Sequence, residues 1–378
     1  MSEFFHKTLH LKLKPGKAAW LAACAREVNQ VWNFCNETSA KAARPFVGAP
    51  RYLTAYDMQK LLTGAYKEFR RLPANSINRI AEEHAARRHQ HRRQKLSWRS
   101  KKKSLGWVPF KGQQARWVKG AVVFAGQRFR VFDSYGLSGV DFRSGCFSQD
   151  ALGDWYFNVV VRLPAQVEAM PSLAVGIDLG LKVIATTSDG DELGAGRWIR
   201  DAAPRLAMAH RRAHKRQAAR IHRRVARQRS DALHKFSTGI VRKYGAIYIG
   251  DVSSTKLAKT RMAKSVLDSG WGMLKTMLQY KGHQAGCIVE IINESFTTRA
   301  CADCGSLTGP QGRTGLAVRG WVCSDCGTEH RRDVNAARNI LARGLARPSA
   351  GTNGGVPRIP AEIRGKTAKD SQLLRKQA

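Results

Sequence analysis

The chain has 378 residues, of which 65 are Lys or Arg and 28 are Asp or Glu, so its formal net charge is +37. Such a charge destabilises a compact chain through self-repulsion unless a polyanion neutralises it, and nucleic acid is the expected polyanion. No apolar stretch reaches the ~18 residues of a spanning helix, and strand-like alternation occupies the place of a signal peptide. We therefore expect no membrane partner and a cytoplasmic or nucleoid-associated protein, whose eight cysteines are thiols and metal ligands rather than disulfides.

The N-terminal part predicts one strand followed by helices. Phe5–Leu13 alternates apolar and polar residues, as a half-buried strand does. After a break at Pro15-Gly16, apolar residues from Leu21 to Cys35 recur three or four positions apart, which predicts a helix of about 20 residues. Further helical segments are expected near residues 55–71 and 76–98.

A run of positive charge overlaps the last of these helices. Arg87–Lys103 holds nine Lys or Arg residues and no acid, with Trp98 inside the run and Trp107 after it. A charge run is usually a solvated face, but this one is the first of two in a very basic chain. We therefore favour contact with nucleic acid, with Arg92 and Arg93 as candidates.

Residues 117–162 change character. Short runs of Val, Phe and Tyr alternate with glycine turns, which predicts a small β-barrel or sheet. Pro164–Pro171 has the composition of a linker. A mixed α/β domain follows, with strands expected at Leu173–Ile177 and Val183–Thr187 and a shorter one near Glu192–Ile199.

A long basic helix is expected after Pro204, which fits a first-turn position. Arg205–Arg229 holds ten Lys or Arg, three His and no acid, and a sparse stripe of Ala218, Ile221 and Val225 docks one face. The other faces then form a basic rod for nucleic acid. The candidate contacts on this rod are Arg211, Arg212, Lys215, Arg216, Arg220, Arg223 and Arg224.

The remaining elements of the mixed domain are a strand, a helix, a strand and a closing helix. They are expected at Ala246–Ile249, around residues 271–278, at Cys287–Ile292 and at Val334–Leu345. The order β-β-β-α-β-α-β-(insert)-α matches an RNase H-like fold. Residues 347–378 have the composition of a disordered basic tail.

Two Cys-x-x-Cys pairs, Cys301 with Cys304 and Cys323 with Cys326, stand 18 residues apart and form a strong zinc-ribbon signal. Four thiolates complete a tetrahedron and leave no open position, so this zinc is expected to be structural. His330 follows the second pair and is expected to contact a sulfur or a phosphate rather than to be a fifth ligand. The other cysteines have apolar neighbours and are expected to pack in cores.

Acidic residues stand where strands end or a helix begins. Asp178 ends a buried strand, where a lone carboxylate is costly without a cation. Asp333 begins the closing helix, where N-capping is the ordinary alternative. The identity of the middle acid is open, because Asp251 follows one strand and Glu294 follows the next. Both side chains reach the same edge of the sheet if those strands are parallel neighbours. Carboxylates so grouped hold two Mg2+ ions in metal-assisted phosphodiester cleavage.

With these residues in view, the chain resembles the TnpB family of transposon-encoded RNA-guided nucleases, which is related to type V CRISPR effectors. The resemblance is carried by Gly176–Gly180, Ser269–Gly272, Leu278, Tyr280-Lys281, Thr297-Thr298, the two Cys-x-x-Cys-Gly knuckles, Arg332–Ile340 and, more weakly, Val28–Asn33.

The resemblance implies an α+β multidomain protein. A wedge-type β-barrel (residues 1–14 and 111–165) would hold a helical recognition insert (15–110). An RNase H-like RuvC nuclease domain (172–295 and 330–346) would carry a four-cysteine zinc-ribbon insert that binds target nucleic acid (296–329). The implied partners are a guide RNA from the chain's own locus and double-stranded DNA. The DNA would be cut with Mg2+ next to a short target-adjacent motif. The basic run and the basic rod would hold the RNA–DNA duplex.

Two positions depart from the family pattern. The second RuvC motif usually has Glu before Asp, and here Gly250 precedes Asp251. The third motif often reads Asp-Arg-Asp, and here it is Arg331-Arg332-Asp333. We expect Glu294 to supply the missing carboxylate, with Asp251 as the fallback ligand. The alternative function is a nuclease-inactive RNA-guided DNA-binding protein. A guide-free DNA-binding protein and a strand-transferring transposase are the other hypotheses.

Overall fold

The computed structural model describes residues 4–347 except residues 45, 47, 94, 165–171 and 316. Two compact units divide the chain, one of Glu3–Pro164 and one that includes Ala165–Ala378. The predicted tail, apart from Arg347, and most of the predicted linker lie outside the described residues. In the described part, no helix is both long and apolar enough to cross a membrane.

Two antiparallel sheets form the β-part of the first unit. The strands of the larger sheet, in spatial order, are β1 (Phe4–Lys12), β7 (Trp155–Pro164), β6 (Asp141–Gln149) and β2 (Trp107–Phe110). The smaller sheet consists of β3 (Ala115–Val118), β4 (Ala121–Phe124) and β5 (Gln127–Phe129). A bridge between Leu13 and Val131 links the ends of the two sheets. The alternation predicted for the first strand is confirmed, because Leu9 and Leu11 are buried in the core.

The helices of this unit are α1 (Ala18–Ala43), α2 (Ala55–Leu61), η1 (Ala65–Lys67), α3 (Ala74–His91) and η2 (Gly112–Gln114). The segment predicted as helical over 55–71 is broken where Gly64 adopts φ 85°. The helix predicted over 76–98 is wrong at its end, since α3 stops at His91 and Arg92 takes a left-handed conformation with φ 50°.

The segment after α3 is fixed to α1 by two asparagines. Asn36 donates to the Leu96 carbonyl at 2.8 Å and accepts from the Leu96 amide at 2.8 Å. Asn33 makes the same pair of bonds with Arg99, both at 2.9 Å. Each asparagine side-chain amide thus bonds to both the N–H and the C=O of one residue, as the backbone of a neighbouring strand would. These bonds order a loop that lacks secondary structure.

Asn36→Ala should lower the free energy of unfolding by about 1–3 kcal/mol, because the part-buried Leu96 amide and carbonyl lose the buried Asn36 side chain as their partner. Urea denaturation followed by fluorescence measures the change. Glu37→Ala is the matched control on the same helix, since Glu37 is exposed, pairs with the exposed Lys41 and should contribute under about 1 kcal/mol. Equal effects of the two substitutions would contradict this role of Asn36.

The second unit is built on a five-stranded sheet. In spatial order its strands are β10 (Glu192–Gly194), β9 (Val183–Thr187), β8 (Ala174–Leu179), β11 (Ala246–Gly250) and β12 (Ile288–Ile292). β8, β9 and β10 pair antiparallel, whereas β8, β11 and β12 run parallel. The prediction that these last three strands are parallel neighbours is confirmed. The third strand is shorter than the predicted 192–199 because a helix starts at Trp198.

The helices of this unit are α4 (Trp198–Arg211), α5 (Lys215–Lys243), α6 (Ser254–Leu257), α7 (Ala263–Ser269), α8 (Trp271–Ala285), α9 (Gly312–Gly315) and α10 (Arg332–Ala346). A hairpin of β13 (Gly320–Val322) and β14 (Glu329–Arg331) lies between the last two. The single basic helix expected after Pro204 is wrong. Pro204 lies inside α4, and the helical path breaks where Ala213 takes φ 53° before α5 begins.

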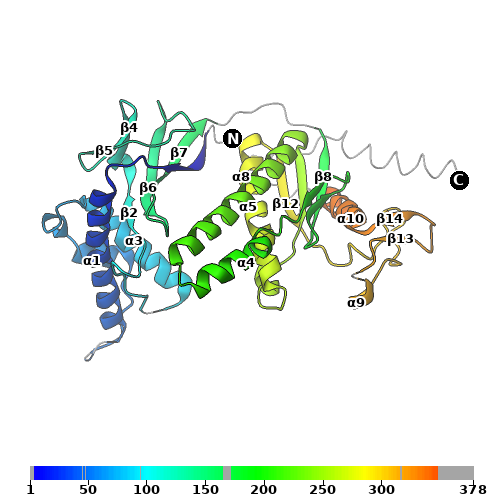
Figure 1. The fold of residues 1–378 in the computed structure, drawn as a ribbon, viewed down its shortest axis with the longest axis horizontal. Helices are drawn as coiled ribbons and strands as arrows, with labels where there is room; N and C mark the ends of the chain where they lie inside the picture. Colours follow the sequence, from blue (N-terminus) through cyan, green and yellow to red (C-terminus); the bar gives the residue numbers. More distant parts are fainter. Residues whose placement is uncertain are drawn as a thin grey trace. The chain divides into compact units, whose positions relative to one another are not determined.

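Strand pleating divides the sheet into two covered faces. Ile247 and Ile249 of β11 pack with residues of α5 and α8, whereas Ala246 and Tyr248 pack with α10. In Figure 1, α5 and α8 accordingly lie on one side of the strands and α10 on the other. Gly176 of β8 permits the close approach of α10, because a Cβ there would lie 2.0 Å from the Ala337 carbonyl oxygen.

The contacts of Lys281 give a structural reason for the lysine in the motif that contains Tyr280-Lys281. Its ammonium, on α8, donates to the hydroxyls of Ser237 and Thr238 at 2.7 Å each and to the His234 carbonyl at 2.8 Å. All three acceptors are on α5, so the lysine ties together the two helices that cover this face of the sheet.

Candidate functional site

Three carboxylates converge on the sheet face covered by α10. Residues two positions apart in a strand point to the same face of the sheet. Asp178 in β8 therefore shares the α10 face with Gly176. Glu294, just after β12, shares that face with Ile292, so both acids point toward α10. Asp333 lies in the first turn of α10, whose N-cap is Arg331 rather than Asp333. Burial, then Glu294 and then Asp333, raises the pKa of Asp178 to about 7. Glu294 and Asp333 therefore both act electrostatically on Asp178.

Glu294 occupies the space above Gly250. A Cβ on Gly250 would lie 2.5 Å from Oε2 of Glu294 and 3.3 Å from Cδ1 of Ile340. The carboxylate at this place thus comes from the neighbouring strand end, and the glycine leaves room for it. Oε2 is buried and has no hydrogen-bond partner among the described residues. Burial first, and Asp251 second, raises the pKa of Glu294.

Asp251 has a different environment from the other acids. It comes directly after Gly250 at the end of β11, so its side chain points away from the face of the sheet to which Gly250 belongs, and it is exposed. Its Oδ1 accepts a hydrogen bond from the Glu294 amide at 3.2 Å. Asp251 therefore fixes the backbone that carries Glu294, while its own carboxylate stays at the margin of the group.

Two cations at this group were not anticipated from the sequence. Nη1 of Arg319 lies 3.3 and 3.2 Å from the two carboxylate oxygens of Asp333. Lys275 on α8 interacts electrostatically with Glu294 and Asp251. Neither residue belongs to a periodic pattern or a recognisable motif, so no sequence signal distinguishes it from the other basic residues.

The acidic group fits a divalent cation. A buried carboxylate oxygen without a partner and a carboxyl group with a raised pKa both indicate excess negative charge. Hard cations prefer oxygen ligands, and Asp178, Glu294 and Asp333 supply them from three different elements. The donor chemistry of these three residues therefore suits such an ion.

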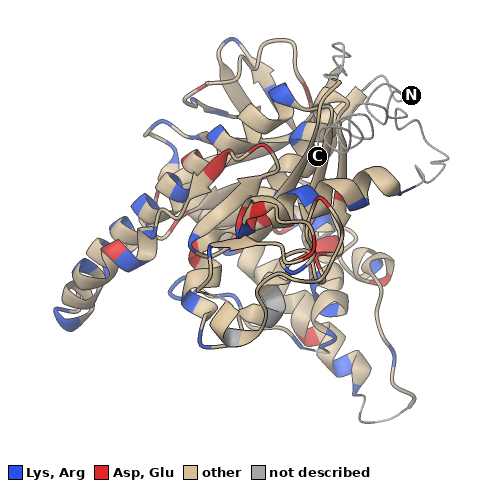
Figure 2. Cartoon of the chain, turned by 90° about the vertical axis from the view of Figure 1, so that its right-hand side faces the viewer, with Lys and Arg blue, Asp and Glu red and all other residues tan. Residues whose placement is uncertain are grey.

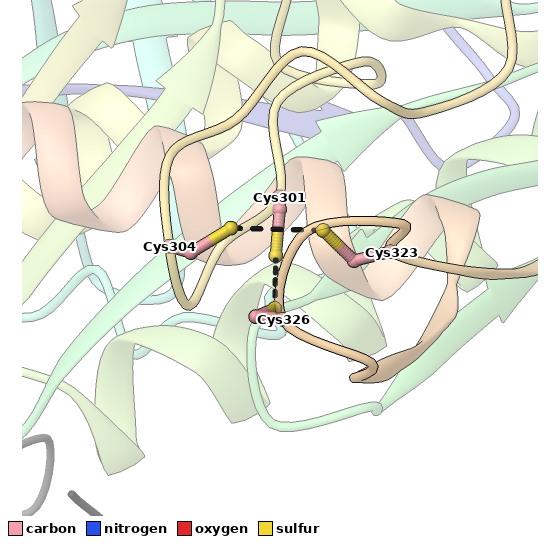
Figure 3. A group of neighbouring side chains, drawn as sticks. All are labelled: Cys301, Cys304, Cys323 and Cys326. Atoms are coloured by element: carbon pink, nitrogen blue, oxygen red, sulfur yellow. Dashed lines mark hydrogen bonds between the residues drawn. The ribbon is translucent and has the colours of Figure 1, made fainter.

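The four cysteines of the two predicted pairs gather at one point, as Figure 3 shows. The Sγ atoms of Cys301 and Cys326 lie 3.6 Å apart, and those of Cys304 and Cys323 also lie 3.6 Å apart. The two knuckles share one geometry, in which the glycine after each pair has positive φ and donates to the carbonyl of the first cysteine at 2.9 Å. This cluster can hold a metal ion.

The surroundings of the cysteine cluster tie it to the acidic site. Nε2 of the buried His330 lies 3.0 Å from Sγ of Cys301, so His330 contacts a sulfur, as one of its two predicted roles requires. On α10, Asn335 and Asn339 both donate to the Ala300 carbonyl, at 2.8 and 2.7 Å. These bonds anchor the start of the cysteine segment beside the helix that carries Asp333.

The basic candidates lie mainly on exposed surface, and Figure 2 shows how widely Lys and Arg are distributed. Arg223 is half-buried, whereas the other six candidates at and after the end of α4 are exposed. Arg205, Arg220 and Arg224 line a small hollow of about 170 Å³ between α4 and α5. Ala218 and Val225 are buried against α4, so the apolar stripe predicted for this region is confirmed.

The run from Arg87 to Lys103 borders a groove of about 770 Å³ in the first unit. Its lining combines arginines with the three tryptophans Trp32, Trp98 and Trp107. Arg93 lines this groove, and Arg92 is exposed beside it. A surface that mixes arginine and aromatic rings suits nucleic acid, since bases stack on such rings.

Comparison with known proteins gives two family models that match parts of the chain. The model "Cas12f1-like, TNB domain" matches residues 271–340, and the OrfB_IS605 model, described as a probable transposase, matches residues 158–261.

Two curated relatives span about half of the chain. A candidate RNA-guided DNA endonuclease of Streptomyces pristinaespiralis is 35% identical over 218 residues, which are 54% of this chain and 53% of that protein. InsQ of Escherichia coli strain K12, which bears the same kind of name, is 29% identical over 223 residues, 51% of this chain and 55% of that protein. The chain thus spans about half the length of these relatives.

A solved structure shares the fold. The Cas12f1–sgRNA–target DNA complex contains a protein chain that matches with a TM-score of 0.56 at 11% identity, covering 90% of this chain and 99% of that chain. The mixed α/β architecture with several sheets is therefore a Cas12f1-like fold.

Proposed function

Because the chain belongs to the TnpB family, we propose that it is an RNA-guided DNA endonuclease. It would bind a guide RNA from its own locus and cut double-stranded DNA next to a short target-adjacent motif. The names of its relatives support the general activity. The observation that carries the proposal is that Asp178 near the end of β8, Glu294 just after β12 and Asp333 in the first turn of α10 all lie on the side of the sheet that α10 covers.

The domain assignment follows from the same proposal. The strand order β10-β9-β8-β11-β12, with the last two strands parallel to β8, supports an RNase H-like RuvC domain over residues 172–295 and 330–346. Residues 296–329 would be its zinc-ribbon insert. Residues 1–14 and 111–165 would form the wedge-type barrel, and residues 15–110 the recognition insert.

Asp178, Glu294 and Asp333 would hold two Mg2+ ions, which when bound would activate a water molecule and steady the leaving oxygen of the phosphodiester. The chain's own residues prepare the site in three ways. Gly250 leaves space for the Glu294 side chain. Asp251 holds the Glu294 amide. Arg319 pairs with Asp333 and is well placed to exchange that carboxylate for a phosphate of the bound strand.

The cysteine cluster would hold a structural zinc ion. The two sulfur–sulfur distances of 3.6 Å are close to the edge of about 3.8 Å expected for a tetrahedron with Zn–S bonds of about 2.3 Å. All four ligands come from the protein, so the ion would fold the insert rather than take part in the reaction.

Purification of the protein with its native flanking locus, followed by sequencing of the bound RNA, tests the proposal. The complex is then incubated with Mg2+ and a plasmid library that carries a matched target beside randomised bases. Cleavage next to an enriched short motif is the expected result. Absence of a discrete bound RNA would contradict guide dependence.

The second candidate function is a nuclease-inactive, RNA-guided DNA-binding protein. One observation favours it, namely that Gly250 stands where the family usually has the second-motif Glu. Motif-dependent binding without cleavage in the same library experiment would identify this function.

The basic surface should contribute affinity rather than sequence choice. Arg220→Ala and Arg224→Ala are each expected to lower the affinity for the guide–target duplex. Each should also make the plot of log affinity against log salt concentration shallower, by the amount that corresponds to about one phosphate contact. Binding isotherms at several salt concentrations measure both. Lys235→Ala is the control on the same helix, because Lys235 is already paired with Asp231 at 2.8 Å. A change in the preferred target sequence would contradict this assignment.

A further inference from the structure

Lys275 is the residue of interest on the α8 side of the acidic site. Its side chain is half-buried, and its ammonium donates to the Val252 carbonyl at 3.1 Å, just beyond the end of β11. An ammonium has three N–H donors, so this bond holds the group in place and leaves donors for another acceptor. Burial lowers the pKa of Lys275, while Glu294 and then Asp251 act in the opposite direction. The ammonium is therefore fixed within electrostatic range of both acids.

Arg319 and Lys275 interact in different ways with the carboxylates next to them. Arg319 hydrogen-bonds to both oxygens of Asp333. Lys275, in contrast, acts on Glu294 through its field, because Oε2 of Glu294 keeps no hydrogen-bond partner in the described part of the chain. That oxygen stays open for a cation. A positive charge fixed nearby then opposes the binding of any divalent ion there.

The same charge has a different effect on the substrate. If ions neutralised the carboxylates, a non-bridging oxygen of the DNA strand would be an anionic acceptor available to a fixed ammonium. Such an oxygen must approach the ions if the strand is to be cut. A lysine held by a backbone carbonyl is already oriented for this contact, so little conformational entropy is lost on binding.

We propose that Lys275 is a positioning residue for the phosphate of the cut strand: its ammonium competes with the divalent ion at Glu294 and, when the ion is bound, donates to a non-bridging phosphate oxygen. This inference rests on the proposed nuclease function. It gives the α8 side of the site a role in substrate placement that the three carboxylates alone do not supply.

Lys275→Met should therefore have two effects of opposite sign. Removal of the positive charge should tighten Mn2+ binding to the protein–RNA complex about three- to tenfold, measured by calorimetry without DNA. Loss of the phosphate contact should slow single-turnover cleavage at saturating Mn2+ by at least about tenfold. Lys275→Arg, which keeps a donor and a charge, should stay within about threefold of the wild type in both measurements.

Lys264→Met is the matched control, because Lys264 is an exposed lysine on neighbouring α7. It should leave Mn2+ affinity and the cleavage rate unchanged. Weaker Mn2+ binding, or an unchanged cleavage rate, in Lys275→Met while the wild type cuts would overturn the role of Lys275 alone. A lowered thermal midpoint together with loss in both measurements would assign Lys275 a purely structural role. No cleavage by the wild type would overturn the nuclease and the phosphate role with it.

Discussion

Glu294→Gln should reduce single-turnover DNA cleavage on the order of 1000-fold while leaving guide-RNA binding and thermal stability unchanged. The amide keeps the shape that fills the space above Gly250 and removes only the charge that a metal ligand requires. Loss of several kcal/mol of charge stabilisation in the transition state corresponds to a rate effect of this size. Cleavage is measured with the purified protein–RNA complex on a matched target at saturating Mg2+.

Asp251→Asn is the matched control for this substitution. Asp251 is exposed, and an asparagine oxygen can still accept the Glu294 amide hydrogen bond, so its loss of rate should remain below about tenfold. An exchange variant sharpens the comparison. Gly250→Glu combined with Glu294→Ala should restore cleavage relative to Glu294→Ala, since the carboxylate is then supplied from β11. Unchanged cutting by Glu294→Gln, with a large loss in Asp251→Asn, would make Asp251 the middle ligand.

Removal of the cysteine cluster should have the second-largest effect. Cys323→Ser is expected to release zinc, unfold residues 296–329 locally and lower cleavage on the order of 100-fold or more. The loss follows from two contacts: Arg319 of this segment pairs with Asp333, and Asn335 anchors the segment to α10. Native mass spectrometry gives the zinc content, with one ion per wild-type chain expected, and a plasmid assay gives the rate.

Cys146→Ser provides the control, because Cys146 lies in β6 of the other unit. This variant should retain zinc and activity. Full activity of zinc-free Cys323→Ser would contradict a structural role for the cluster in the cleavage site.

Local sequence patterns predicted most of the elements of the second unit. Val183–Thr187 and the strands before Asp178 and Asp251 are short apolar runs bounded by turn residues, and such runs identify buried strands. The cysteine cluster was equally predictable, because the spacing within each pair alone brings two sulfurs to one point.

Two of the errors occur where the backbone takes a rare conformation without a glycine. Arg92 and Ala213 have positive φ, and each interrupts a pattern that reads as continuous helix. Nothing in an arginine or an alanine signals this geometry, because residues other than glycine rarely adopt positive φ. Pro204 was also misleading, because it lies inside α4 rather than in the first turn of a helix.

The middle acid shows the limit of sequence reasoning at the site. Asp251 and Glu294 both follow strands that end at the same edge, so strand position alone does not separate them. The face to which each side chain points, and the space above Gly250 that the Glu294 side chain fills, do separate them. Both features require the sheet and α10 to be in place. Arg319 and Lys275 reach the site through contacts between elements, so their roles depend on tertiary structure.

A crystal structure of the protein–RNA complex soaked with Mn2+, with anomalous scattering to locate the ions, tests the central claim most directly. The account predicts ions ligated by Asp178, Glu294 and Asp333, with Asp251 outside the coordination sphere. An ion held by Asp251 with Glu294 out of reach, or no ion at this sheet edge, would contradict it.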